Sequence, residues 1–279
     1  MSTEPQWTQV IESEGRLFDL KLGELWRYRD LVYQFVRRHF VAQYKQMILG
    51  PAWHLIQPLL TAIMFTVVFG RIAGMPTDGA PAFLFYMAGT VMWGYFSAVL
   101  TGTSGTFTGN AHIFGKVYFP RLAVPMSILL SKLMAFAVQF GFFLCFLAYF
   151  MLCEANVAPN VWVLATPLLL LLMAALGLGL GVIVSAMTTR YRDLAIVVGF
   201  GVQLLMYATP VSYPLSEPYR TWMALNPIAP VMELFRYAYL GAGTVSAGML
   251  AYRAGITAVI LFVGVVMFNK VERTFMDTV

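Results

Sequence analysis

The chain has 279 residues, of which 59% are hydrophobic and only 11% charged, and its net charge is +5. Soluble domains carry about 25% charged residues, so this composition excludes an ordinary soluble protein and indicates an all-α polytopic membrane protein. The positive charge does not indicate a nucleic-acid partner, because seven of the 18 Lys and Arg residues precede Gly50, where they suit the anionic inner leaflet of a membrane.

The first 50 residues are predicted to form a cytoplasmic tail and an amphipathic helix. Residues 1–14 are polar and lack the apolar run of a signal peptide, so we expect the N-terminus to stay in the cytoplasm. Between Asp19 and Gln46 apolar residues recur at helical spacing opposite a charged face. Such a helix is too charged to span a bilayer, which favours a position in the membrane interface over packing on a soluble core. Its apolar face consists of Leu25, Tyr28, Val32, Phe35, Val36, His39 and Phe40.

Gly50-Pro51 separates this charged part from an almost wholly apolar remainder. Glycine permits unusual backbone dihedrals and proline fits the first turn of a helix, so the pair predicts the end of one helix and the start of another. Trp53 and His54 carry ring side chains typical of a membrane–water boundary. We therefore divide the chain into an N-terminal tail with its interface helix, residues 1–50, and a transmembrane domain, residues 51–279.

Six apolar segments are predicted to span the membrane, at about residues 52–69, 81–107, 124–152, 161–187, 195–209 and 251–268. An even number of spans puts both termini on the same side. The N-terminal part, the turns between alternate spans and the C-terminal tail hold fourteen of the Lys and Arg residues, and the opposite side holds four. This bias predicts that both termini are cytoplasmic.

A proline-rich stretch precedes the last span. Two short apolar segments, Trp222 to Leu225 and Val231 to Leu240, are separated by Asn226-Pro227. Neither is long enough to cross about 30 Å of hydrocarbon at 1.5 Å per residue. The pattern favours two re-entrant half-helices, because broken backbone at membrane depth is tolerated only where protein or a water-filled cavity lines it.

The sequence lacks the motifs of common enzymes. The segment from His112 to Val117 contains Gly-Lys but not the Ser or Thr and the upstream glycine of a phosphate-binding loop. The three histidines are scattered, and no Cys or acidic cluster accompanies them. We therefore expect no catalytic site, cofactor or metal in this chain. The glutamines and glycines within the spans are interpreted as helix-packing residues: Gln57, Gln139, Gln203, Gly177, Gly179 and Gly181.

Four motifs resemble the transmembrane subunit of ABC-2 type exporters, and within that family the branch that exports O-antigen, capsule and teichoic acid. The first motif combines Gln43-Tyr44-Lys45, Leu49-Gly50-Pro51-Ala52-Trp53 and Gln57-Pro58. The second is Ile113–Arg121, the third is Arg190-Tyr191-Arg192-Asp193-Leu194, and the fourth is Asn226-Pro227 followed by a short helix. The resemblance covers nearly the whole chain. It implies a homodimer in the bacterial inner membrane, in contact with membrane lipids. It also implies that the homodimer pairs with two copies of a separate ATP-binding subunit, where ATP and magnesium would bind.

The resemblance also implies that two cytoplasmic turns contact the ATP-binding subunits. The alternative is that they are plain basic loops that touch nothing. Short, charged and structured turns can transmit a rigid motion, which favours the coupling role. The residues expected to couple are Asn110, His112, Phe114, Lys116, Tyr118, Arg190, Tyr191, Arg192 and Asp193.

The implied cargo is a glycan on a lipid diphosphate carrier, which needs cations for the diphosphate and aromatic rings for the sugars. Arg37, Arg38 and Lys45 are expected to attract the diphosphate. Boundary belts and helix packing are the alternative for the aromatic residues. The expected glycan path consists of Tyr86, Trp93, Tyr95, Phe96, Tyr207 and Tyr213. The expected outer gate consists of Asn226, Pro227, Glu233 and Arg236. Glu233 and Arg236 are three residues apart and are expected to form a local pair.

Two other functions are compatible with this sequence. An ABC-2 exporter of a drug or small lipid would have the same fold. A membrane enzyme acting on lipid-linked sugars would need acidic residues or metal ligands at the membrane face, and the sequence has no cluster of them.

Overall fold

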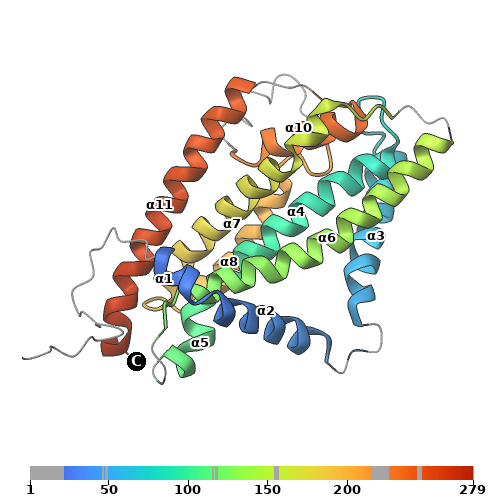
Figure 1. The fold of residues 1–279 in the computed structure, drawn as a ribbon. Helices are drawn as coiled ribbons and strands as arrows, with labels where there is room; N and C mark the ends of the chain where they lie inside the picture. The colour runs from blue at the N-terminus through green and yellow to red at the C-terminus, as the bar shows by residue number, and fades with distance from the viewer. Residues whose placement is uncertain are drawn as a thin grey trace, which may run out of the picture.

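The computed structural model describes residues 22–45, 47, 50–114, 116, 119–153, 157–214, 226–243 and 247–278. Every regular element in these ranges is a helix, as Figure 1 shows. The elements are α1 (Leu22–Arg27), α2 (Arg29–Tyr44), η1 (Gly50–Ala52), α3 (Trp53–Phe65), η2 (Thr66–Ile72), α4 (Ala82–Ser104), α5 (Thr106–Phe114), α6 (Ala123–Leu152), η3 (Val161–Ala165), α7 (Thr166–Thr188), α8 (Leu194–Tyr207), α10 (Ala229–Leu240) and α11 (Ala247–Thr278).

Five helical segments in the described ranges are long and apolar enough to cross a membrane: Trp53–Ile72, Ala82–Ser104, Ala123–Leu152, Val161–Thr188 and Gly248–Glu272. They correspond to five of the six predicted spans. The remaining segment, α8, is apolar but has only 14 residues. Its length of about 21 Å is less than the 30 Å of a typical hydrocarbon core. The structure therefore supports a polytopic all-α protein with five candidate spans.

The break at Gly50-Pro51 is confirmed. Gly50 has φ +47° in the left-handed region, and the short η1 leads directly into α3. Pro58 lies inside α3 and, having no N–H, removes one hydrogen bond from the helix. The helix then continues as the π-helical η2.

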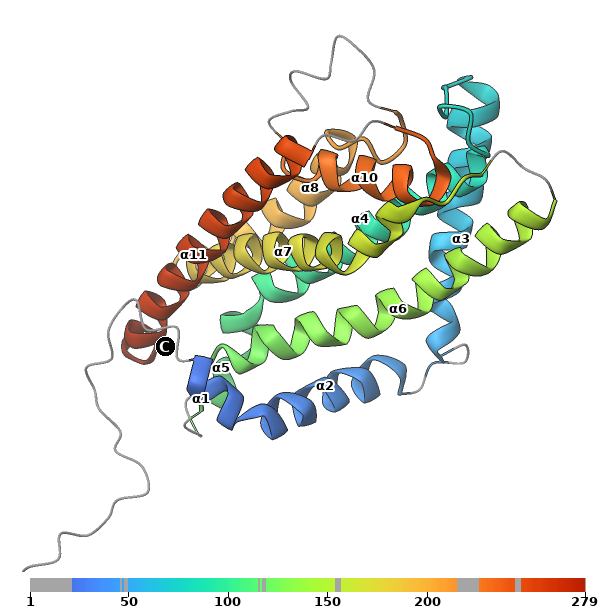
Figure 2. The ribbon, with the colours of Figure 1, turned by 45° about the horizontal axis from the view of Figure 1, so that its top comes forward.

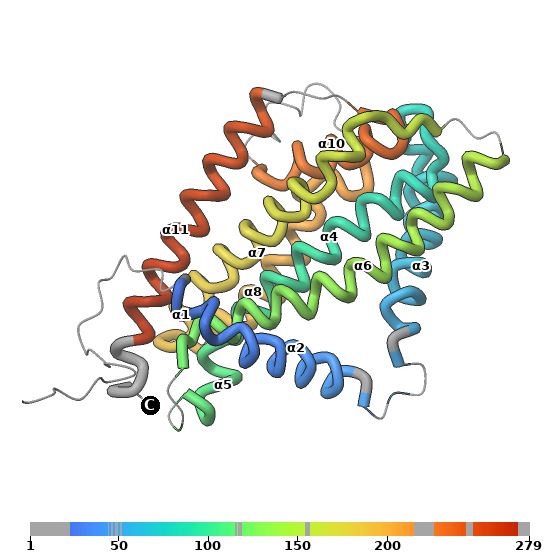
Figure 3. Tube along the Cα trace, viewed as in Figure 1, coloured from blue at the N-terminus to red at the C-terminus, as the bar shows by residue number. Residues whose placement is uncertain are grey.

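α4 is the central helix of the fold. It packs against α3, α6, α7, α8 and α10, and Figure 3 shows it between α6 and α7. Most of its residues are buried, among them Leu84, Phe85 and Met92. The position of α4 thus decides which side chains the surrounding helices meet.

Glycines bring α7 close to both α4 and α11. A Cβ on Gly177 would lie 3.1 Å from the carbonyl oxygen of Phe96 in α4. A Cβ on Gly179 would lie 2.9 Å from the Cα of Leu261 in α11, and one on Gly264 would lie 2.6 Å from the Gly179 oxygen. These contacts between backbones confirm that the span-four glycines serve close helix packing.

The N-terminal segment forms two helices and not the one continuous helix that its periodicity predicts. The chain turns at Tyr28, whose ψ of 20° lies outside the helical range, and α1 and α2 follow on either side. α2 packs against α6 through the buried side chains of Val32 and Val36. The predicted apolar face is thus the packed face for most of its length, although Phe40 is exposed.

A cluster of phenylalanines holds α5 against α2 and α11. The Phe107 ring stacks on Phe268 of α11 at a centroid distance of 4.4 Å, and Phe119 lies 5.6 Å from Phe35 of α2. Phe114 lies between them, 6.0 Å from Phe107 and 5.8 Å from Phe119. We call these five side chains the Phe cluster. Figures 1 and 2 show α1, α5 and the C-terminal end of α11 at one end of the molecule.

The predicted short helix before the last span is present as α10. Its 12 residues extend about 18 Å, too short to cross the membrane. It ends at Gly241, which adopts φ +71°. The other predicted half-helix, Trp222 to Leu225, lies outside the described residues.

Replacing Gly179 with alanine should destabilise the bundle, because the new methyl group would press on the α11 backbone at Leu261. Gly141→Ala on α6 is the matched control, since a Cβ there meets nothing within 4 Å. We expect a lower melting temperature for Gly179→Ala in detergent and an unchanged or slightly higher one for Gly141→Ala. Equal melting temperatures would contradict the close α7–α11 contact.

Candidate functional site

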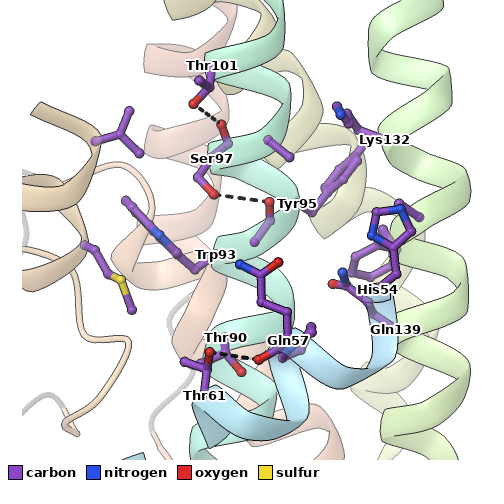
Figure 4. A pocket seen from close by; sticks show the side chains of 17 residues that line it. His54, Gln57, Thr61, Thr90, Trp93, Tyr95, Ser97, Thr101, Lys132 and Gln139 are labelled. Atoms are coloured by element: carbon purple, nitrogen blue, oxygen red, sulfur yellow. Dashed lines mark hydrogen bonds between the residues drawn. The ribbon is translucent and has the colours of Figure 1, made fainter. Parts of the chain in front are cut away.

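A pocket of about 470 Å³ lies between α3, α4, α6 and α8. Figure 4 shows labelled side chains from α3, α4 and α6 around this space. We call it the polar pocket, because so many polar groups line it within helices that are otherwise apolar. They are His54, Gln57, Thr61, Thr90, Tyr95, Ser97, Thr101, Lys132 and Gln139.

Helical spacing explains how these side chains converge. His54, Gln57 and Thr61 follow one another at intervals of three and four residues, so they share one face of α3. Lys132 and Gln139 are seven residues apart and share one face of α6. The polar residues of α4 recur in the same way. This spacing is the signal in the sequence that points to the pocket. The interpretation of the glutamines as packing residues overlooked that signal.

The charge in the polar pocket comes from Lys132. Across the part of the chain that the structure describes, its ammonium group forms no hydrogen bond or ion pair. His54 lies on the facing helix, with its Nε2 3.4 Å from Nε2 of Gln43. The pKa of His39 on α2 is lowered below its ordinary value. Burial of the imidazole is the main cause, and the positive charges of Arg38 and Lys132 lower it further. The imidazole of His39 is therefore neutral at pH 7.

Two of the predicted path residues, Trp93 and Tyr95, line the polar pocket. Tyr86 and Phe96 do not, since each side chain has 0% exposed surface in the main core. A side chain without exposed surface cannot contact a ligand, so the expectation that these two rings face a glycan path is corrected. Their size and apolar character serve packing around α4 instead.

The other two predicted path residues lie together at the end of α8. Tyr207 is 59% exposed. The hydroxyl group of Tyr213 donates a hydrogen bond to the Tyr207 carbonyl at 2.9 Å. Neither tyrosine lines the polar pocket, so the structure divides the predicted path into two separate places.

The first predicted coupling turn contains α5. His112 and Lys116 are exposed, and Asn110 is half-buried with its amide donating to a carbonyl one turn earlier in its own helix. Phe114 is 5% exposed and belongs to the Phe cluster, so the expectation that it contacts another subunit is corrected to a role inside the protomer. Tyr118 lies outside the described residues.

The second predicted coupling turn joins α7 to α8. Its four residues Arg190, Tyr191, Arg192 and Asp193 are all exposed. The Arg190 guanidinium lies 5.6 Å from the centre of the Tyr191 ring, within range of a cation–π contact. The turn therefore presents charged and aromatic groups on one exposed surface.

The cations predicted to attract a diphosphate are exposed on α2 and at its end. Arg37 and Arg38 point away from the face that Val32 and Val36 bury against α6, and Lys45 follows the last helical turn. None of the three lines the polar pocket.

The predicted outer-gate residues Asn226 and Pro227 lie where the chain returns to α10. The Asn226 side chain accepts a hydrogen bond from the Ile228 N–H at 2.9 Å. It donates to the Ala208 carbonyl at 3.0 Å and to the Thr209 hydroxyl at 2.8 Å. These bonds tie the start of α10 to the end of α8.

Arg236 is buried, with 3% of its surface exposed. Its guanidinium donates to the carbonyls of Pro210 at 2.7 Å and Tyr213 at 3.4 Å, and also to that of Val211. Its carbon lies 3.8 Å from the centre of the Phe85 ring in α4. Arg236 thus connects α10, the segment after α8 and α4, and its predicted pairing with Glu233 stays a prediction.

Metal ligands do not converge in the described ranges, where no three His, Cys, Asp or Glu side chains lie close enough to hold an ion.

Known proteins match most of this chain. The ABC-2 type transporter family matches residues 30–240, which is more than half of its length. The chain belongs to the ABC-2 type transporter family.

Three relatives are similar to this ABC-2 type transporter protein over most of their length. The O-antigen export system permease protein RfbA of Myxococcus xanthus is 27% identical over 92% of this chain and 98% of its own. The protein of the same name from Klebsiella pneumoniae is 26% identical over 89% of this chain and 94% of its own. The polysialic acid transport protein KpsM of Escherichia coli is 27% identical over 82% of this chain and 89% of its own.

Replacing Arg236 with lysine should destabilise this ABC-2 type transporter protein. Lysine keeps the charge but lacks the planar fork that reaches several carbonyls, and each buried carbonyl left without a donor costs about 1–3 kcal/mol. We expect Arg236→Lys to lower the melting temperature in detergent by several degrees. Arg71→Lys, at an exposed arginine, is the control and should leave it unchanged. An unshifted Arg236→Lys protein would show that the carbonyl contacts add nothing to stability.

Proposed function

We propose that this chain is the permease subunit of an ABC transporter that exports a lipid-linked polysaccharide, such as an O-antigen, across the bacterial inner membrane. The polar pocket between membrane-spanning helices is the observation that carries the proposal. Relatives named as O-antigen export permeases, which match over nearly their whole length, support it.

A glycan needs a polar surface inside the membrane. Polar side chains within spanning helices are costly in contact with lipid and therefore indicate a hydrated path or a bound polar ligand. Hydroxyl and amide groups, such as those of Thr90, Gln57 and Gln139, form hydrogen bonds with sugar hydroxyls. Trp93 and Tyr95 also line the pocket, but only 6% and 3% of their surfaces are exposed, so they contribute its edges and not open ring faces. A drug or small apolar lipid would not need so many polar groups.

The proposed topology has six crossings and two cytoplasmic termini. α8 and the segment that follows it to residue 214 make the fifth crossing together, although α8 is short by itself. α2 lies in the cytoplasmic interface, and α10 is a re-entrant helix on the opposite side. The common location of α1, α5 and the end of α11 in Figure 1 supports this arrangement.

A homodimer would complete the polar pocket. In the apolar window of Trp53–Ile72 only 6% of the residues are buried inside the protomer, and α8 has no buried residue. Both segments border the pocket and expose large apolar side chains such as Leu60, Phe200 and Leu204. A second copy of the chain placed against α3 and α8 would cover these surfaces and enclose a continuous path.

The energy for export would come from two ATP-binding subunits that hold ATP and magnesium. α5 and the Arg190–Asp193 turn are the proposed contact surfaces, with His112 and Lys116 exposed on the first. The Phe cluster joins α5 to α2 and α11, so a displacement of α5 would move both helices with it. A contact made through a rigid, anchored element transmits motion more effectively than a loose loop does.

Deletion of the gene should abolish the surface polysaccharide and leave lipid-linked glycan inside the cell. Blotting of the surface glycan measures the first effect, and extraction of the carrier lipid measures the second. A deletion strain with normal surface glycan and altered drug sensitivity would overturn the proposal in favour of a drug or small-lipid exporter.

Arg190→Glu should weaken the contact with the ATP-binding subunit, because it reverses a charge on the proposed coupling surface. The expected result is poorer co-purification and loss of the permease's effect on ATPase activity, with an unchanged melting temperature of the permease alone. Arg71→Glu, at an exposed arginine distant from both turns, is the matched control. If both variants assemble and function like the wild type, the turn has no coupling role.

A further inference from the structure

The polar pocket contains a positive charge that is not balanced by a carboxylate from the described residues around it. No Asp or Glu is among the described residues that line it. Lys132 is half-buried there, and neither a hydrogen bond nor an ion pair engages its ammonium group within the described part of the chain. A charged group inside a spanning helix is costly, and such residues normally pair with another group or mark the path of a ligand.

The surroundings of Lys132 leave room for that charge. Its side chain runs beside α4 at Gly102, where a Cβ would lie 3.7 Å from Lys132 Cε. The imidazole of His54 and the amide of Gln139 line the same pocket and add further hydrogen-bond donors. A cation with neighbouring neutral donors is the arrangement that binds oxyanions.

Lys132 also lies at a suitable depth for a lipid phosphate. α6 has 30 residues and is about 45 Å long, which exceeds the 30 Å hydrocarbon core, so its ends project beyond it. Lys132 follows Ala123, the first residue of α6, by nine positions, or about 14 Å along the axis. It therefore lies in the half of the bundle that contains α2 and α5, close to the phosphate layer on that side.

We propose that Lys132, together with His54, binds a phosphate group inside the polar pocket. The proposal rests on the proposed function, in which this phosphate belongs to the diphosphate that joins the glycan to its lipid carrier. Arg37, Arg38 and Lys45 on the surface of α2 would attract the diphosphate, and Lys132 would hold it between the helices. The flexible stem of lysine suits a group that must be bound and then released.

The headgroup of a membrane phospholipid offers the same phosphate chemistry, so the experiment must separate the two sources. The intact complex with its ATP-binding subunit is purified in detergent and incubated with a polyprenyl diphosphate, with phosphatidylglycerol, or with both. Native mass spectrometry then measures the occupancy of each lipid. The variants are Lys132→Ala, Lys132→Arg and the control Lys270→Ala, which removes an exposed cation of α11 outside the pocket.

We expect Lys132→Ala to bind the polyprenyl diphosphate at least about tenfold more weakly, because a charge-assisted hydrogen bond is lost. Lys132→Arg should restore most of the binding, and Lys270→Ala should match the wild type. Phosphatidylglycerol occupancy should be the same in all four proteins. A melting temperature close to the wild-type value for Lys132→Ala excludes misfolding as the cause of its weaker binding.

Undiminished binding of the diphosphate by Lys132→Ala would overturn the proposal. Loss of phosphatidylglycerol alone would keep the phosphate site but overturn its assignment to the cargo. The deletion strain tests the proposed function separately, because normal surface glycan there would refute export whether or not Lys132 binds phosphate.

Discussion

The close approach of α7 to α4 and α11 is the constraint on which the rest of the fold depends. Inside a membrane, helices gain little from burying apolar side chains, since lipid is equally apolar, and close backbone contact becomes the main source of specific packing. Gly177, Gly179 and Gly264 provide it here. The Gly177 contact holds α4 against α7, while Gly179 and Gly264 hold α7 against α11. With α4 fixed in this way, its polar side chains meet those of α3 and α6 and form the polar pocket.

Local patterns in the sequence were sufficient for much of the architecture. The all-helical class, the break at Gly50-Pro51, five of the spans and the short α10 follow from composition, turn residues and helix length, which act over a few neighbouring residues. The break between α1 and α2 at Tyr28 was not predicted, because the apolar periodicity continues across it. The polar pocket was not predicted either, since its lining comes from separate helices whose relative rotation no local pattern encodes.

Lys132 and Arg236 illustrate that limit. Lys132 is the one Lys or Arg within α6 and Arg236 the one within α10, and the sequence alone does not show how much room surrounds either charge. The structure surrounds Arg236 with backbone carbonyls and an aromatic ring, so both terminal nitrogens of its guanidinium donate hydrogen bonds within the protomer. It gives Lys132 an open pocket instead. Tyr86 and Trp93 differ in the same way, since they lie on the same helix and only Trp93 reaches the pocket.

Pro58 lies inside α3 and is one of the residues that line the polar pocket, so α3 has a hinge at the level of the pocket. A helix that lacks one backbone hydrogen bond bends at that place with less energy than elsewhere. The wall that α3 contributes is therefore the more compliant one, whereas the wall of α4 is held by glycine contacts on its far side. The width of the space between them can change through bending of one helix alone, while the packed interior of the bundle keeps its shape.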